Sequence, residues 1–489
     1  MTPGARAVER EREAGLDQLF LEVREMTSRL PRRTVLGGMI GGAALAAAGT
    51  GAGSAVAAGR APGATGQGAV GPEPYVPVAV GAGGGPAGTD RVHVLKVGPD
   101  TAATVLLLVP GMFGAANDFR LLARDLVAAA PGLQVWALDR REENLSDRSG
   151  FAGPDPLAHY LDGHYRTQDP AASPFAAHWG LPLTLTDLRA VVRSAGRGGR
   201  RVVLGGHSWG ATTAMAYAAW DFDGCPGYRD LAGLVVVDGG VLGAFDGTGE
   251  PVLDSPEQIR ERLAAIDAGA VFDLTLSGVG LGSRAESTQI WYQLAGHYAL
   301  HDPDGPSLLQ PRLPDALRLP YPVTNAGLLG FFVDAGFGWP NSITVHSGHL
   351  ADSGDVRGWV DDGITPLGRV AAAYAGPVPA VWEWYWPARL SVDLDVTDAY
   401  TDSPLARSLG LRLHHADRLD VPLYAFGTSY ANGTIEAAAR TVVANSRIPY
   451  AAYETDTGMN HLDPLFAAPA HNTLTRTLAE FLKGRPGTR

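Results

Sequence analysis

The sequence predicts an α/β fold in which a mostly parallel central sheet is covered by helices on both faces. Short apolar runs recur along the chain without alternating polar residues, as expected for strands that are buried on both faces. Amphipathic stretches such as 118–130 and 183–194 lie between these runs and predict helices. Hydrophobic residues make up 45% of the chain, which is enough for a large core.

The predicted elements fall into two blocks. Five apolar runs in the first block predict strands at 92–97, 104–109, 133–138, 201–205 and 234–237. From 243 to 417 the pattern lapses, and proline, glycine and aromatic residues are scattered among short apolar runs. The second block predicts a strand at 421–426, a helix at 434–444, a strand at 449–453 and a helix at 474–482. We therefore expect one sheet that is interrupted by a long insertion.

The first 57 residues have the parts of a secretory signal peptide. A basic pair, Arg32 and Arg33, precedes a weakly apolar run at 35–48 and a small-residue stretch that ends near Ala57. The pair resembles a twin-arginine signal, so we expect export by the twin-arginine machinery and a secreted protein. The apolar run is shorter than the ~20 residues of a membrane span, so no stable membrane insertion is expected after cleavage. Residues 58–88 are rich in glycine, alanine and proline and predict a flexible linker.

Composition and spacing exclude several classes of site. The chain has 39 Lys and Arg against 51 Asp and Glu, and this net charge of −12 argues against nucleic-acid binding. The single cysteine, Cys225, excludes an internal disulfide and a cysteine-based zinc site. His297 and His301 have helical spacing but no partner glutamate, and three aspartates at 393–398 lack the pattern of a calcium loop. We interpret these aspartates as solvated loop charges and expect neither a metal nor a cofactor.

The strongest local motif lies where the predicted strand at 201–205 meets an alanine-rich helix. Residues 206–210 read Gly-His-Ser-Trp-Gly, and a Gly-x-Ser-x-Gly pattern between strand and helix predicts a nucleophile elbow. Gly206 and Gly210 leave room for a strained turn that projects the serine oxygen above the sheet. Ser208 is therefore the predicted nucleophile.

With this motif the chain resembles the α/β-hydrolase superfamily, of the serine-hydrolase kind, over about 90–245 and 418–485. The resemblance implies an α/β-hydrolase fold whose core is formed by 89–241 and 418–489. It also implies that 242–417 form a cap, or lid, over the nucleophile. Epoxide hydrolases and haloalkane dehalogenases of this superfamily use aspartate at the elbow, so the serine found here disfavours both.

A second match lies before the elbow. Residues 106–114 resemble the strand and His-Gly-x-x-Gly loop that supply the oxyanion hole in this family, with Pro110 in place of the usual histidine. Aligning Gly111 with the family glycine implies that the backbone N–H groups of Met112 and Trp209 are the two oxyanion donors. Two such donors oppose the negative charge that grows on a carbonyl oxygen during attack.

The resemblance also indicates the other two members of a catalytic triad. The family places its histidine after the last strand, where this chain has His461. Many members place the acid after the preceding strand, but 427–433 contain no carboxylate. A smaller set places it after the strand that follows the nucleophile, which makes Asp238 the predicted acid. A buried turn aspartate is the alternative reading of Asp238, and Glu436 and Asp456 are the other candidates for the acid.

The predicted cap has two aromatic stretches, at 326–333 and 382–386. Such a lining suits a bulky apolar ligand, but the same residues are equally suited to be the hydrophobic core of the cap itself. The predicted substrate-binding residues are Phe113, His207, Phe331, Phe332 and Trp384. The charged residues 139–141 either shape the pocket or pair with one another.

Together these features predict an exported serine hydrolase that cleaves a carboxylic ester or lactone of a bulky apolar small molecule through an acyl-enzyme. A peptidase or amidase on the same triad is the first alternative, because acylation is shared and only leaving-group recognition differs. The second alternative is a non-catalytic binding protein on a hydrolase scaffold.

Overall fold

The structure is a computed structural model that describes residues 73–249, 255–337 and 344–484. The predicted signal peptide at 1–57 and residues 58–72 of the predicted linker lie outside the described residues. Within the described ranges, no helix is both long enough and apolar enough to cross a membrane.

Eight strands form one central sheet in the order β1-β2-β4-β3-β5-β8-β11-β12. Their bounds are β1 Tyr75–Ala79, β2 Arg91–Val97, β3 Thr104–Val109, β4 Leu133–Asp139, β5 Arg201–His207, β8 Gly233–Val237, β11 Leu423–Thr428 and β12 Ala451–Asp456. Strand β2 is antiparallel to both of its neighbours, and all other neighbouring pairs are parallel. Every residue of β4, β8 and β11 is buried, which explains why apolar residues predominate in them. This strand order with one reversed strand is that of the α/β-hydrolase fold, so the predicted fold class is confirmed.

Strand β1 corrects the predicted linker at 58–88, because 75–79 of that range belong to the sheet. The exposed Pro77 lacks a backbone N–H, which an edge strand such as β1 tolerates. The hydroxyl of Tyr75 donates a 2.5 Å hydrogen bond to Oδ2 of Asp139 at the end of β4. This contact adds to the antiparallel pairing of all five β1 residues with β2.

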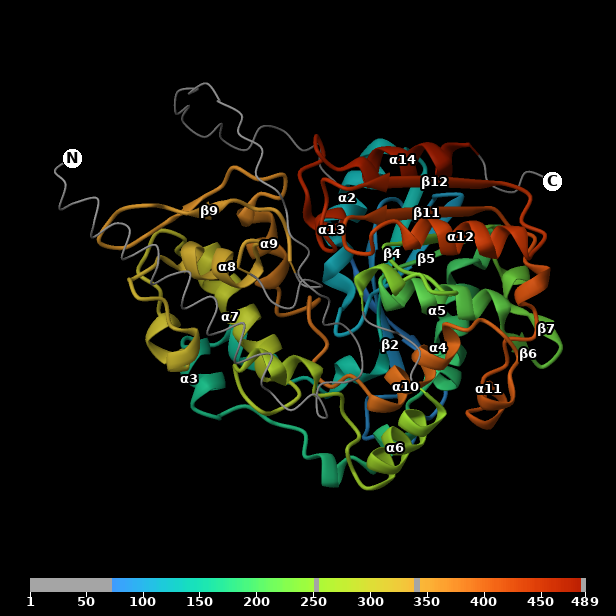
Figure 1. Ribbon diagram of the computed structural model, residues 1–489, viewed down its shortest axis with the longest axis horizontal. Coiled ribbons are helices and arrows are strands. Elements are labelled where there is room, and N and C mark those ends of the chain that lie inside the picture. Colours follow the sequence, from blue (N-terminus) through green and yellow to red (C-terminus); the bar gives the residue numbers. More distant parts are fainter. Residues whose placement is uncertain (1–72, 250–254, 338–343, 485–489) are drawn as a thin grey trace.

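Helices cover both faces of the sheet (Figure 1). On one face, α2 (Arg120–Ala129) packs against α14 (Thr473–Lys483), and on the other α4 (Leu181–Ala195) packs against α5 (Trp209–Ala219). Helix α12 (Thr434–Ala444) packs on β11 and β12. Every residue of α5 is buried, because the sheet covers one side of this helix and further helices cover the others.

The chain between β8 and β11 forms the long insertion. Its α helices are α6 Pro256–Asp267, α7 Ser287–His301, α8 Asn325–Val333, α9 Leu367–Tyr374, α10 Ala388–Thr397 and α11 Pro404–Ser408. Helix α7 packs against α8 and α9, and together with α3 (Pro156–Leu161) they form a lobe beside the sheet (Figure 1). Helix α10 instead packs on α4, α5 and α6, against the core.

The remaining elements are short. Two hairpin-like pairs are β6 Asp221–Phe222 with β7 Cys225–Pro226 and β9 His349–Leu350 with β10 Trp359–Val360, and a single turn of helix, α13, spans Asp463–Phe466.

The three aspartates at 393–398 are not solvated loop charges, so that interpretation is wrong. They lie on or directly after α10 and are buried. Asp393 accepts hydrogen bonds from the backbone N–H of Leu181 and from Arg389, each at 2.8 Å, and Asp395 pairs with Arg262. Partners from α10 itself and from distant parts of the chain compensate for the burial of Asp393 and Asp395. In the described residues, no group of three or more His, Cys, Asp or Glu side chains could hold a metal ion.

Candidate active site

Ser208 lies in the sharp turn between β5 and α5. Its backbone has φ 55° and ψ −130°, which is strained for a residue with a side chain, and its N–H donates to the carbonyl of Val237 at 2.9 Å. A Cβ on Gly206 would lie 2.1 Å from the backbone of Gly210, and one on Gly210 would lie 2.0 Å from the carbonyl oxygen of Val109. Both glycines of the motif are therefore required by close backbone contact.

Asp238 and His461 are joined by a hydrogen bond at the carboxyl end of the sheet. The distance between Oδ2 of Asp238 and Nδ1 of His461 is 2.6 Å, and both side chains are almost inaccessible to solvent. Asp238 also accepts hydrogen bonds from the N–H of Thr428 at 2.8 Å and from its hydroxyl at 2.7 Å. Burial tends to raise the pKa of Asp238, but the contacts with His461 and Thr428 outweigh it and lower that pKa. Asp238 is consequently ionised at neutral pH.

The other candidate acids have different partners. Glu436, on α12, binds Arg440 and the hydroxyl of Thr455. Asp456, at the end of β12, accepts hydrogen bonds from the hydroxyl of Thr473 and the N–H of Gly458. Among the described residues, neither carboxylate forms a hydrogen bond with the histidine. The structure thus brings Asp238, and neither of these two residues, to His461.

Two aromatic rings enclose the imidazole of His461. The rings of His207 and Tyr430 each lie 4.3 Å from it, centroid to centroid. Nε2 of His207 is 2.8 Å from the carbonyl oxygen of His461. Burial, together with the neighbouring imidazole of His461, lowers the pKa of His207 to about 3. His207 is therefore neutral at neutral pH, and its Nε2–H donates to the backbone of His461.

Thr428 and Tyr430 were not predicted from the sequence. Parallel pairing of β11 with β8 places Phe426 beside Val237, so the residues just after Phe426 lie next to Asp238. The segment 427–433 has no carboxylate, and the roles of its hydroxyl and aromatic side chains follow from this strand pairing and not from the local sequence.

Replacing His207 tests whether this residue is buried in its neutral form. Because the pKa falls from 6.5 to about 3 on folding, the unfolded state binds more protons between these pH values, and stability rises with pH there. Acidification from pH 6.5 to 4 should destabilise the wild type by about 3 kcal/mol through this group alone. Denaturant unfolding of His207→Asn at both pH values should lack this part of the loss.

The exposed His301, at the end of α7, provides the control His301→Asn. Equal pH dependence of unfolding in the wild type and His207→Asn would contradict the buried neutral state of His207.

The loop after β3 passes directly beside Ser208. A Cβ on Gly111 would lie 2.9 Å from Cβ of Ser208 and 3.4 Å from its Oγ. Trp209 is the first residue of α5, so its N–H has no partner within the helix. Within the part of the chain that the structure describes, neither this N–H nor that of Met112 donates a hydrogen bond. Two backbone donors thus remain free close to the serine.

The predicted substrate-binding residues of α8 pack inside the insertion. Phe332 is buried and stacks on Tyr292 of α7, with 5.1 Å between ring centroids. Phe331 lies 5.7 Å from the ring of Phe337. The described contacts of both side chains are with other residues of the insertion, which favours the interpretation of these aromatics as its hydrophobic core.

Trp384 also belongs to this core and is completely buried. Its ring meets those of Tyr160 and Tyr165 edge-on at 5.8 and 6.0 Å, and its Nε1–H donates to Gln293 at 2.8 Å. Phe113, by contrast, lies in the loop beside the serine, 6.0 Å from the ring of Trp386. Of the five residues predicted to bind substrate, His207 contacts the ring of His461 and Phe113 lies in the loop beside Ser208, whereas the described ring contacts of the other three are with neighbouring aromatic residues.

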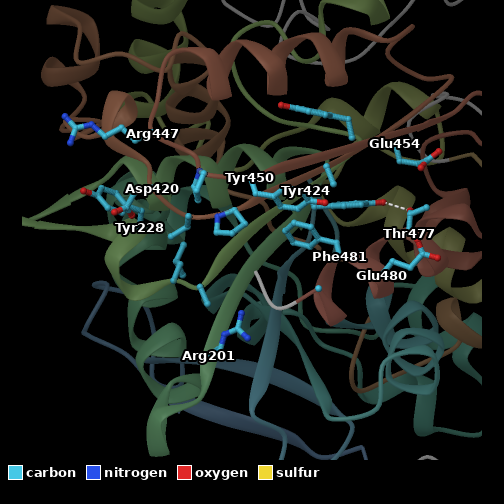
Figure 2. Close-up of a pocket in the computed structure, with 18 of the residues that line it drawn as sticks. Arg201, Tyr228, Asp420, Tyr424, Arg447, Tyr450, Glu454, Thr477, Glu480 and Phe481 are labelled. Carbon is cyan, nitrogen blue, oxygen red and sulfur yellow. Dashed lines mark hydrogen bonds between the residues drawn. The ribbon is translucent and has the colours of Figure 1, made fainter. Parts of the chain in front are cut away.

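A cavity of about 1140 Å³ lies at the opposite end of the strands (Figure 2). It is lined by Arg201 at the start of β5, by Pro422 just before β11 and by the aromatic side chains Tyr424, Tyr450 and Phe481. A second cavity of about 240 Å³ lies between α3 and α7. Ser208, Asp238 and His461 line neither cavity. All three follow the carboxyl ends of their strands, whereas the first cavity lies at the other end.

The sequence matches no protein-family model and none of the curated proteins. Among solved structures, a putative lipase from Sulfolobus solfataricus is 16% identical with a TM-score of 0.44, covering 82% of this chain and 92% of that chain. An epoxide hydrolase from an endophytic Streptomyces is 15% identical with a TM-score of 0.42, covering 84% and 96%. A thermophilic esterase from Thermogutta terrifontis is 15% identical with a TM-score of 0.37, covering 85% and 100%.

Proposed function

We propose that this protein is a serine hydrolase that cleaves carboxylic esters through an acyl-enzyme. Ser208 is the nucleophile, His461 the general base and Asp238 the acid that orients the imidazole. The 2.6 Å hydrogen bond between Asp238 and His461 carries the proposal. It joins two residues that are 223 positions apart in sequence, and both lie at the end of the sheet where Ser208 occupies its strained turn.

In the proposed acylation, Oγ of Ser208 attacks the ester carbonyl carbon and its proton passes to Nε2 of His461. The N–H groups of Met112 and Trp209 donate to the oxygen that becomes negative in the tetrahedral intermediate. The intermediate collapses as the bond to the leaving alcohol breaks, and His461 returns the proton to that alcohol. Water then attacks the acyl-enzyme by the same route and releases the acid and the free serine.

The electrostatic setting suits this cycle. Asp238 is ionised because its pKa is lowered, so it stabilises the imidazolium that forms on His461. His207 lies against the same ring but is neutral at neutral pH, so it adds no second positive charge beside the imidazolium.

We further propose that the substrate is a discrete small ester. The segment 380–386 of the insertion runs directly along the loop at 113–117, since Glu383 N–H donates to the carbonyl of Phe113 at 2.7 Å and Ala115 N–H to that of Val381 at 3.1 Å. Chain this close to the loop leaves less room than an open lipase groove. The preference for a bulky apolar substrate has less support, since three of the aromatic residues that suggested it pack in the insertion.

Export through the predicted signal peptide remains part of the proposal.

The proposal is tested by comparing p-nitrophenyl acetate with its matched amide, p-nitroacetanilide. We expect an initial burst of p-nitrophenol equal to the enzyme concentration, because an acyl-enzyme accumulates when deacylation is slow. We also expect kcat/KM to be at least ~10²-fold higher for the ester than for the amide. Equal turnover of the amide would favour the peptidase or amidase alternative. Turnover of neither would favour a binding protein, and rapid turnover of a triglyceride emulsion would contradict a small-molecule substrate.

A further inference from the structure

Arg140, which the proposed mechanism does not use, holds the loop that carries the proposed oxyanion donor Met112. It directly follows β4, and its side chain is buried, with 3% of its surface exposed. Nη2 of Arg140 donates to the carbonyl oxygen of Pro110, the residue just before the loop glycine. Nη1 lies 3.1 Å from Oε2 of Glu383, and the guanidinium stacks over the ring of Trp386 at 4.7 Å. One planar cation thus contacts the loop and the insertion at the same time.

Glu383 is itself fixed to the same loop. Its backbone N–H donates to the carbonyl of Phe113, and the neighbouring Trp382 is paired with Gly114 in an antiparallel bridge. The side chain is buried, and this burial together with the nearby Glu142 raises the pKa of Glu383 well above its usual value. Glu383 can accept the hydrogen bond from Arg140 whether or not its carboxyl group is ionised.

The other end of the loop is held from the same strand. Asp139, the last residue of β4, accepts a hydrogen bond from the N–H of Ala116 through Oδ1 and from the hydroxyl of Tyr75 through Oδ2. Between the two anchored ends, Phe113 has φ 58°, in the left-handed region that disfavours side chains. A strained segment keeps its shape only when its surroundings over-determine it. Arg140 restrains the start of the loop at Pro110, and Asp139 restrains its end at Ala116.

We propose that Arg140 is a positioning residue that orients the Met112 N–H toward the developing oxyanion, and that Glu383 makes this orientation depend on the seated insertion. The inference rests on the proposed function. The residue acts through the Pro110 carbonyl and touches neither substrate nor the reacting atoms. Its role explains how the oxyanion loop is held although proline replaces the family's histidine at 110. A guanidinium can reach two acceptors in one plane, whereas an ammonium on a shorter reach cannot keep both contacts.

The expected effect lies in the rates of acylation and deacylation, which both pass through an oxyanion, and not in substrate affinity. A displacement of about 1 Å in a catalytic group costs ~10²-fold in rate. For p-nitrophenyl acetate we therefore expect Arg140→Lys to lower kcat by about 10²-fold and to change KM by less than about threefold. A trifluoromethyl ketone, which forms a tetrahedral oxyanion adduct with a serine, should lose affinity by the same factor as kcat/KM falls.

Arg141→Lys is the matched control. Arg141 is the next residue, is equally buried and forms a two-fold hydrogen bond with the buried Asp187, but it does not contact the oxyanion loop. This variant should lower the thermal midpoint at least as much as Arg140→Lys while leaving kcat within about threefold of the wild type.

Two variants of Glu383 provide a second test if Arg140→Lys does not fold. Glu383→Gln keeps an acceptor for Arg140 and should retain wild-type kcat, whereas Glu383→Leu leaves the guanidinium without its partner and should lower kcat. The inference is overturned if Arg140→Lys and Arg141→Lys lose kcat equally, or if kcat falls without loss of ketone affinity. Unchanged kcat in both Arg140→Lys and Glu383→Leu would also overturn it. A wild type that hydrolyses no ester would instead overturn the proposed function.

Discussion

Ser208→Ala is expected to lower kcat/KM for p-nitrophenyl acetate by about 10⁶-fold, to the level that binding and the oxyanion donors alone can support. The substitution removes the attacking oxygen but keeps the backbone strain, since alanine and serine have the same preferences at φ 55°. Stability should therefore change little. The measurement is initial-rate kinetics together with thermal unfolding of both proteins.

Ser446→Ala is the matched control for this variant. Ser446 follows α12 at the opposite end of that helix from the candidate site, and its substitution should leave the rate unchanged. If Ser208→Ala kept more than about one per cent of the wild-type rate, another group would have to be the nucleophile.

Asp238→Asn is expected to lower kcat by about 10⁴-fold with the fold retained. The carboxylate accepts hydrogen bonds from His461 and from two donors of Thr428, and an amide can replace only part of this set. An amide NH₂ group facing Nδ1 of His461 selects the imidazole tautomer that cannot accept the serine proton. The measurement is kcat between pH 6 and 9.

Asp456→Asn provides the control for loss of a carboxylate near the end of β12, and it should retain the wild-type rate. A nearly normal rate in Asp238→Asn, combined with a large loss in Asp456→Asn, would move the role of the acid to Asp456.

The sheet and the elbow were predictable because their signals are local. Buried parallel strands leave unbroken apolar runs, and the elbow needs glycine at two fixed positions around Ser208. Strand ends were less accurate. The predicted strands at 421–426 and 449–453 are Leu423–Thr428 and Ala451–Asp456 in the structure. The apolar pattern stops at the last large side chain, but backbone pairing continues through Gly427 and Thr428, which lie opposite Thr455 and Asp456.

The features that were missed depend on contacts between distant parts of the chain. Strand β1 pairs with β2, and its Tyr75 contacts Asp139, which lies 64 residues away. The sequence predicts Trp384 to bind the substrate, but its indole N–H donates a hydrogen bond to Gln293, which lies 91 residues away. Such partners cannot be read from local composition, because charge and aromatic content do not reveal what lies across a packed interface.

Labelling with a biotinylated fluorophosphonate tests the central claim most directly, because this reagent reacts with a serine only when a base and an oxyanion site activate it. The protein is treated, digested and analysed by mass spectrometry, with a heat-denatured sample and Ser208→Ala as controls. We expect one adduct per chain, on the peptide that contains Ser208, and none in either control. Absence of an adduct in the native wild type, or an adduct on a different serine, would contradict the assignment of Ser208 as an activated nucleophile.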